Sequence, residues 1–271
     1  MESYPEWLEI VLGNEIEQPI SNDDRTTPSA YLGIPKDEIY ARIIGGGQAD
    51  FDKNEVEISA DDRALLYAKY NQRRHIDELR YAFKKLFPDT IQSRIITLLD
   101  IGCGPFTAGL SWAAAKGSID EFRYYGVDRA KSMLRLGGRL AKSAQIVGAY
   151  HPKSTYWFGT SLEEIDFGPI RGDWIVVVLS YLFASPNLDV EELMKSLDAA
   201  LKRIGPGPVA VLYTNSARAD ANKKYPQLEA GLIDLGFDLK IEDQQVFTQT
   251  TKTKIPIRYA LFIRNESTSL I

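Results

Sequence analysis

Two aspartates and two glycines carry the clearest chemistry in the sequence. Residues 98–115 read LLDIGCGPFTAGLSWAAA, in which an apolar run ends at Asp100, is followed by Gly102 and Gly104, and leads into an Ala-rich amphipathic segment. Glycines let a strand turn sharply into a helix and approach a ligand closely. A second apolar run ends at Asp128, where a carboxylate can accept hydrogen bonds from two ribose hydroxyls. The pattern indicates a nucleotide-like ligand.

The spacing argues against a dinucleotide. In the pattern G-x-G-x-x-G counted from Gly102, the third glycine position is occupied by Thr107. Asp100, directly in the loop, would repel a pyrophosphate but suit an ammonium group. Both features favour a ligand with a cationic amino-acid end and an adenosine end, which is S-adenosylmethionine (SAM).

Two motifs in tandem resemble those of a known superfamily. LLDIGCGPFTAG is similar to motif I of the class I SAM-dependent methyltransferases, and YYGVDRAKSML is similar to their ribose-binding motif. The resemblance extends over roughly residues 95–264 and implies methyl transfer to an unidentified acceptor. It implies cofactor contacts at Asp100, Gly102, Cys103, Gly104, Asp128, Arg129, Thr160, Ser161 and Ser180.

The sequence departs from that superfamily at two positions. Phe106 stands where many members have a third glycine and is expected to crowd the loop, and Thr160 stands where many have an acid near the adenine. These departures keep open an alternative in which the chain retains the fold as a binding or assembly protein without methyl transfer. By the resemblance, Thr160 and Ser161 touch adenine, and Ser180 and Tyr181 line the methyl-transfer site.

A narrower resemblance points to RNA. GCGPFTAGLSWAAA and VDRAKSMLRLGGRLAKS, preceded by a helix bearing Tyr and Arg, are similar to the methyltransferase-like proteins associated with the small ribosomal subunit. Those proteins typically carry a cysteine cluster, whereas this chain has one cysteine. RNA or ribosome-associated methylation is therefore a second alternative.

Methyl transfer is an in-line displacement in which the protein supplies positioning and a dry cavity. The chain has LSYLFASPN in place of the Asn/Asp-Pro-Pro-Tyr loop of amino-group methylases, and Cys103 lies inside the cofactor loop. Methylation of exocyclic amines in DNA and of pyrimidine C5 is therefore not expected. Ser180, Tyr181 and His75 are the candidate catalytic residues, with His75 either a base, if its helix covers the site, or a solvated side chain.

Strands and helices alternate through most of the chain and place these residues. A helical pattern opens at Ser59 and closes at Pro88, and continuous apolar runs such as 95–100 and 174–179 indicate strands buried on both faces. The order predicts an α/β fold with a doubly wound, mostly parallel seven-stranded sheet and an antiparallel C-terminal hairpin. Residues 1–90 are expected to form an arm and helical cap, and residues 91–271 the SAM-binding domain. Residues 1–30 show little periodicity and suggest a partly ordered arm.

One predicted helix is strongly basic. Residues 122–154 contain seven basic residues against one acid, Asp128. Such a run is usually a solvated face, and the alternative is a surface that follows RNA phosphates. The helix itself carries Lys131, Arg135, Arg139 and Lys142 on one face.

The composition of the chain argues against several other classes of protein. The 271 residues are 44% hydrophobic and 25% charged, with a net charge of −5, so no global nucleic-acid signal is present. One cysteine and two histidines leave little for a metal site, and none is expected. The start of the sequence lacks the lysines of a signal peptide, and no apolar run is long enough to span a membrane. A cytoplasmic protein without a membrane partner is expected, while its oligomeric state stays open.

Overall fold

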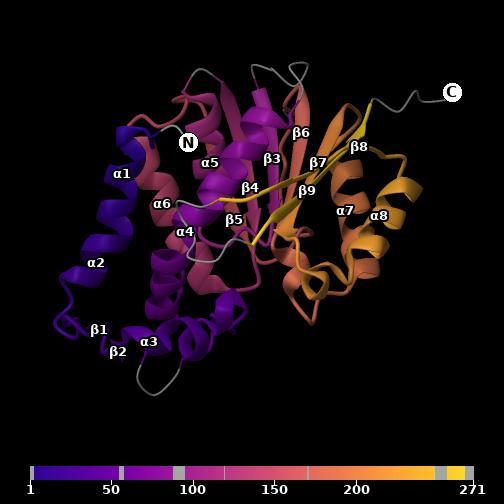
Figure 1. Ribbon diagram of the computed structural model, residues 1–271. Helices are drawn as coiled ribbons and strands as arrows, with labels where there is room; N and C mark the ends of the chain where they lie inside the picture. The colour runs from indigo at the N-terminus through magenta and orange to yellow at the C-terminus, as the bar shows by residue number, and fades with distance from the viewer. Residues whose placement is uncertain are drawn as a thin grey trace, which may run out of the picture.

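A seven-stranded sheet forms the centre of the molecule (Figure 1). The computed structural model describes residues 3–54, 58–87, 95–118, 120–169, 171–247 and 255–265. The strand order is β5-β4-β3-β6-β7-β9-β8, and β9 is antiparallel to both β7 and β8 while the other neighbours are parallel. The strands are β3 (Ile95–Ile101), β4 (Glu121–Val127), β5 (Thr155–Gly159), β6 (Trp174–Ser180), β7 (Val209–Ser216), β8 (Asp238–Gln245) and β9 (Ile257–Arg264). The predicted doubly wound sheet with an antiparallel C-terminal hairpin is confirmed.

The strand order places a switch point between β3 and β6. From β3 the chain proceeds outward through β4 and β5, and from β6 it proceeds in the opposite direction through β7. Both central strands are buried, and Asp100 pairs with Val178 near their carboxyl ends. Ligands of open α/β sheets bind at such a point. The segments that follow Ile101 and Ser180 therefore face the same site.

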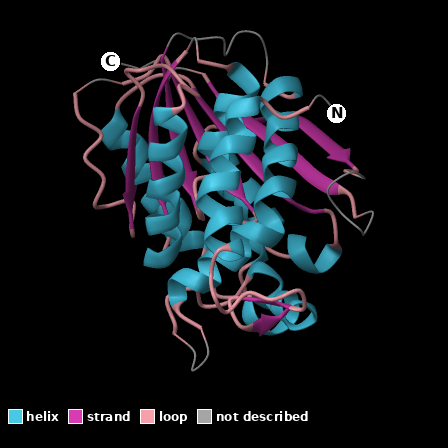
Figure 2. Ribbon diagram, turned by 90° about the vertical axis from the view of Figure 1, so that its left-hand side faces the viewer, coloured by secondary structure: helices cyan, strands magenta, loops and turns pink. Residues whose placement is uncertain are grey.

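Helices cover both faces of the sheet, as Figures 1 and 2 show. One face packs against α4 (Ala60–Lys85), α5 (Thr107–Lys116) and α6 (Lys131–Ile146), and the other packs against α7 (Val190–Ile204) and α8 (Tyr225–Asp234). The first core contains Leu8, Phe83, Leu98 and Leu110, so the N-terminal segments and the sheet share one continuous core. In the described residues, no helix has the length and apolar character needed to cross a membrane.

Helix α4 begins where the sequence predicted. Ser59 accepts a hydrogen bond from the backbone N–H of Asp62, whose side chain accepts from the backbone N–H of Ser59. This reciprocal capping box satisfies donors that the first turn leaves open. Ile76, Leu79 and Phe83 recur at helical spacing and are buried. The helix thus presents one face to the sheet and fixes the residues that line the site.

Residues 6–21 are helical and pack against the rest of the molecule, so the expectation of a partly ordered arm is wrong for the described part of residues 1–30. Leu8, Leu12, Ile16 and Ile20 recur at every fourth position and are all buried, a spacing masked in the sequence by acidic residues. Glu9 pairs with Arg73 of α4 at 2.8 Å. The elements that precede α4 are α1 (Glu6–Leu12), η1 (Gly13–Glu17), α2 (Gln18–Ser21), β1 (Ala30–Tyr31), β2 (Ile34–Pro35), α3 (Lys36–Glu38), η2 (Ile39–Ile43) and η3 (Gly45–Gly47).

Residues 3–54 together with α4 are called the cap below. The part of the cap from β1 to η3 lies at one end of the sheet (Figure 2). On the other side of the sheet, a short 3₁₀ helix, η6 (Ala219–Asn222), precedes α8. Pro226 lies in the first turn of α8, where its missing N–H costs no hydrogen bond.

Candidate active site

Backbone hydrogen bonds tie together the carboxyl ends of three strands. The N–H groups of Gly102 and Cys103 both donate to the carbonyl of Val127, at 2.8 and 3.0 Å. The N–H of Asp128 donates to the carbonyl of Gly159 at 3.2 Å. The loop after β3, the acid after β4 and the end of β5 therefore form one connected edge.

The glycine loop is shaped to leave room above it. Gly102 has φ +74° and Gly104 has φ +51°, a region that favours glycine. A Cβ on Gly104 would have no heavy atom within 4 Å, whereas one on Gly102 would lie 3.1 Å from Leu182 Cδ1. The open space over Gly104 is a cradle that a ligand can enter and that a side chain would fill.

Asp128 stands at the rim of this cradle. Its Oδ2 accepts from the N–H of Gly104 and its Oδ1 from the N–H of Ala130, both at 2.9 Å. Burial raises its pKa, and these two hydrogen bonds oppose the rise. Each carboxylate oxygen keeps further acceptor capacity, and the residue is partly exposed. Arg129 follows it as an exposed side chain.

Asp100 and Cys103 lie beneath the loop. The Asp100 carboxylate is buried and accepts from the hydroxyl of Tyr124 at 2.7 Å. Burial raises its pKa to about 7. The Cys103 thiol is buried as well, and burial raises its pKa. Ligand contact by these two residues stays a prediction, since their side chains are engaged below the open face.

Phe106 does not crowd the loop, and that expectation is corrected. Its backbone adopts φ +64°, the left-handed conformation that suits a glycine, while its ring is fully buried. The ring packs edge-on to Tyr124, with centroids 4.7 Å apart. A Cβ on Gly109 would lie 2.0 Å from the ring. The side chain thus points into the core, and a glycine one turn along α5 makes room for it.

An acid does lie near the end of β5, although the sequence analysis missed it. Glu164 accepts from the Thr160 backbone N–H at 3.2 Å and from its hydroxyl at 3.1 Å. Thr160 and the adjacent Ser161 are both partly exposed. The sequence signal is the pair of acids in TSLEE, Glu163 and Glu164, which lie three and four residues after Thr160.

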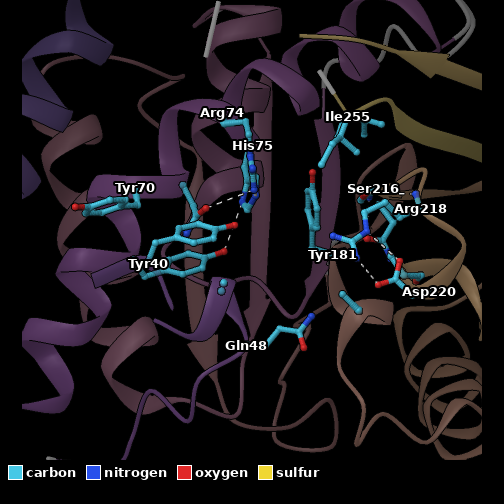
Figure 3. A pocket seen from close by; sticks show the side chains of 18 residues that line it. Tyr40, Gln48, Tyr70, Arg74, His75, Tyr181, Ser216, Arg218, Asp220 and Ile255 are labelled. Atoms are coloured by element: carbon cyan, nitrogen blue, oxygen red, sulfur yellow. Dashed lines mark hydrogen bonds and ion pairs between the residues drawn. The ribbon is translucent and has the colours of Figure 1, made fainter. Parts of the chain in front are cut away.

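A cavity of about 770 Å³ opens between the cap and the loops after β6 and β7 (Figure 3). The cap contributes one wall and the end of the sheet contributes the other. Tyr40 and Tyr70 lie across from Tyr181 and Arg218 in Figure 3, with His75 between them. The lining residues are Tyr40, Gly46, Gly47, Gln48, Tyr67, Tyr70, Asn71, Arg74, His75, Tyr181, Ala184, Asn215, Ser216, Arg218, Asp220, Ala221, Ile255 and Ile257.

The geometry around His75 fixes its protonation. Arg74 Nη2 lies 2.9 Å from His75 Nε2, and because a guanidinium can only donate, Nε2 accepts and the proton is on Nδ1. Nδ1 faces the Tyr67 hydroxyl at 3.5 Å. Burial and the charge of Arg74 lower the pKa of His75 well below 6.5. His75 is thus a neutral ring whose two nitrogens are both engaged.

Two of the residues predicted to be catalytic lie where β6 ends: Ser180 is its last residue, and Tyr181 follows it. Tyr181, in the left-handed region at φ +57°, donates its backbone N–H to the carbonyl of Thr214 at 2.9 Å. Its ring stacks on that of His75, with centroids 4.4 Å apart. The Ser180 hydroxyl lies 3.2 Å from that of Thr214. The structure brings His75 and Tyr181 together in one cavity wall and holds Ser180 beside them.

Glu78 is a buried carboxylate behind this wall. Its side chain is 1% exposed, and the Tyr181 hydroxyl and the charge of Arg74 favour its ionised form. Arg74 Nε lies 3.6 Å from Oε1. Burial raises the pKa of Glu78 to about 8. No pattern in the sequence distinguishes this acid from the exposed acids of other helices.

The basic face of α6 is partly neutralised by the cap. Arg135 pairs with Asp61 at 2.7 Å, and Arg139 pairs with Glu15 at 3.6 Å. Lys131 and Lys142 are exposed. Two of the four basic side chains therefore pair with acids of the cap, which the linear sequence could not show.

Among the comparisons with known proteins, only the search of solved structures finds similar proteins. No family model matches the sequence, and no curated protein matches it. The cofactor-bound protein Rv0187 from MTB is similar at 14% identity, over 80% of this chain and 94% of that one, with a TM-score of 0.46. A SAM-dependent methyltransferase from Methanosarcina mazei is 17% identical, over 63% and 93%, with a TM-score of 0.42. The N-methyltransferase NodS from Bradyrhizobium japonicum, in complex with S-adenosyl-L-homocysteine (SAH), is 15% identical, over 72% and 87%, with a TM-score of 0.44.

The strand order of the sheet and the glycine loop after its first central strand are the features that the two sequence motifs implied. The antiparallel β9, inserted between β7 and β8, completes the pattern. The chain therefore has the doubly wound, Rossmann-like fold that the sequence predicted.

Proposed function

We propose that the chain is a SAM-dependent methyltransferase that acts on a small-molecule acceptor in the cavity beneath the cap. The observation that carries the proposal is the continuity between the two halves of the site. Tyr181 lines the cavity, and Cδ1 of the next residue, Leu182, lies 3.1 Å from the position that a Cβ on Gly102 would take. The cavity wall after β6 therefore adjoins the glycine loop assigned to the cofactor.

The residues present fit the cofactor. The cradle over Gly104 admits a ligand, and Asp128 at its rim offers acceptors for two ribose hydroxyls. Glu164, near Thr160, offers an acceptor for the exocyclic amine of adenine. When bound, SAM supplies an electrophilic methyl group on a sulfonium. Cys103, Arg129 and Ser161 surround this region, and their contacts remain predictions.

The cavity residues act by positioning and by excluding water. Both nitrogens of His75 are engaged, so the ring orients Tyr67 and Tyr181 and does not take a proton in this arrangement. Ser180 supports the Tyr181 loop through Thr214. An acceptor with a good nucleophile needs no general base. Rings from the cap and from Tyr181 enclose the space in which the acceptor would be held.

The size of the cavity and the charge of its surroundings favour a small molecule over RNA. Its volume is within the range of about 300–1,000 Å³ typical of small-ligand pockets. The arginines of α6, which suggested phosphate contacts, pair with Asp61 and Glu15 of the cap. Methylation of RNA and a binding role without transfer become outcomes of the test.

The test is transfer of a labelled methyl group from SAM. The purified protein is incubated with the low-molecular-mass extract of the cells that make it and, separately, with their RNA. Label in a small molecule, lost in Tyr181→Ala but kept in Tyr156→Ala, a matched variant at a tyrosine that does not line the cavity, supports the proposal. Label in RNA would favour the second alternative, and no label in either fraction, with SAH bound, would favour a binding protein.

A further inference from the structure

Asn71 and Arg74 place hydrogen-bond donors at the same wall of the cavity. Both residues line it and lie one turn apart on α4. Asn71 is 1% exposed, and its amide nitrogen has no partner among the residues that the structure describes. An unpaired buried amide costs free energy. The donor is therefore available to a ligand that enters the cavity.

Arg74 supplies a positive charge beside this amide. Its Nη2 lies 3.4 Å from Asn71 Oδ1, which orients the amide so that the nitrogen is left free. Its other close partner, His75, is neutral. The acid near it, Glu78, lies 3.6 Å from Nε and has a pKa raised to about 8. Arg74 Nε makes no hydrogen bond to the residues that the structure describes, so the guanidinium keeps a donor for an anion.

The same stretch of α4 is fixed to the glycine loop. Gln72 donates from Nε2 to the carbonyl of Pro105 at 3.0 Å and accepts from the Thr107 hydroxyl at 3.1 Å. Asn71 directly precedes Gln72 on α4, so it lies on the stretch of helix that Gln72 fixes to the loop assigned to the amino-acid end of the cofactor. Asp100, the acid of that loop, is engaged beneath it by Tyr124.

We infer that Asn71 and Arg74 form a carboxylate-binding site, and that the carboxylate is that of the cofactor's amino-acid end. The inference rests on the proposed function. A planar guanidinium beside an amide N–H matches the two oxygens of a carboxylate. A carboxylate on the acceptor is the other source of the same chemistry, and the experiment separates the two.

The experiment measures the affinity of three ligands by calorimetric titration. SAH carries the carboxylate, its decarboxylated analogue S-(5′-adenosyl)-3-thiopropylamine lacks only that group, and 5′-methylthioadenosine lacks the whole amino-acid end. In the wild type, removing the carboxylate is expected to weaken binding about 10- to 100-fold. In Arg74→Gln, this ratio is expected to fall to about 3 or less, with 5′-methylthioadenosine bound as in the wild type.

Arg73→Gln is the matched control. It removes the same charge from the neighbouring position, where Arg73 pairs with Glu9 at the surface, and the ratio is expected to stay at its wild-type value. Asn71→Asp, a second variant of nearly the same size, is expected to bind the decarboxylated analogue better than SAH.

Three results would overturn the inference. Equal affinities for SAH and the decarboxylated analogue in the wild type would assign the pair to the acceptor. An unchanged ratio in Arg74→Gln, or an equal loss in Arg73→Gln, would place the carboxylate elsewhere. If the folded wild type bound none of the three ligands, the proposed function would fail first, and that result is distinct from a change in the ratio.

Discussion

His75 of the cap stacks on Tyr181 of the sheet edge, with ring centroids 4.4 Å apart and planes inclined by 22°. The pair joins α4 to the loop after β6 at the centre of the cavity wall. Stacked aromatic pairs contribute about 0.5–1.5 kcal/mol beyond the area that they bury. The contact therefore couples the position of the cap to that of the loop after β6, and both line the cavity.

This coupling predicts a non-additive effect on stability. In a double-mutant cycle of His75→Leu and Tyr181→Leu, the free energies of unfolding are expected to show an interaction of about 0.5–1.5 kcal/mol. Urea denaturation of the four proteins measures it. Tyr81→Leu in place of Tyr181→Leu serves as control, since Tyr81 packs against Phe247 and Tyr259 instead. Additive losses would show that the stacking contributes nothing.

Glu78 predicts a pH dependence of stability. Its pKa is raised to about 8 in the folded state, so the folded protein binds a proton that the unfolded chain releases near pH 4.5. Stability from this group is complete below pH 4.5 and is lost as the pH rises toward 8. Relative to Glu78→Gln, the wild type is expected to lose about 1.4 kcal/mol per pH unit over this window.

The measurement is urea denaturation of both proteins from pH 5 to 9. The groups that act on Glu78 are Arg74, Tyr181 and Asp77, and its own charge acts in turn on Tyr259. Glu191→Gln, which removes an acid 81% exposed, controls for general charge effects and is expected to give no such slope. A pH-independent difference between the wild type and Glu78→Gln would mean that Glu78 is ionised when folded.

The fit between Phe106 and Gly109 predicts a second coupling. In the wild type, Gly109→Ala would push its methyl into the Phe106 ring and is expected to cost about 2 kcal/mol or more. In a Phe106→Ala background, the ring is gone, and the same substitution is expected to be nearly neutral, because alanine also favours the helix. Thermal or urea unfolding of the four proteins measures the loss in free energy of unfolding. An equal loss from Gly109→Ala in both backgrounds would contradict the packing of Phe106 over Gly109.

The pairing of Arg135 and Arg139 with cap acids predicts weak RNA binding. At about 0.15 M salt, the dissociation constant for a structured RNA is expected to lie in the range of non-specific binding, about 10⁻⁴–10⁻⁶ M. Fluorescence anisotropy over a salt series measures it. Asp61→Asn with Glu15→Gln frees both arginines and is expected to tighten binding. Nanomolar, sequence-selective binding by the wild type would revive the RNA alternative.

The sheet could be predicted from the sequence because its signals are local. The run ending at Asp100 and the run WIVVVL are buried on both faces, and burial of this kind imposes continuous apolar stretches. The glycine loop could be predicted for the same reason, because its residues are contiguous in the sequence. The spacing of Leu8, Leu12, Ile16 and Ile20 was equally local, but acidic and polar residues between them concealed it.

The cavity could not be predicted, because its lining comes from segments far apart in the chain. Tyr40, Asn71, Tyr181 and Ile257 meet only after the cap has folded over the sheet. The free amide of Asn71 and the buried acid of Glu78 depend on that packing as well. The Phe106 ring can point into the core because Gly109 has no side chain, and the sequence motif considers each of these positions by itself.

The most direct test of the account is the affinity of SAH for the wild type and for Asp128→Asn. The variant keeps the size of the side chain and one acceptor oxygen, so the hydrogen bond from Gly104 can persist. Circular dichroism confirms that both proteins are folded, and Asp166→Asn, at an exposed acid, is the control. The account predicts saturable binding of SAH by the wild type and the control, weakened at least about 10-fold in Asp128→Asn. A folded wild type that does not bind SAH, or an Asp128→Asn variant that binds it equally well, would contradict the account.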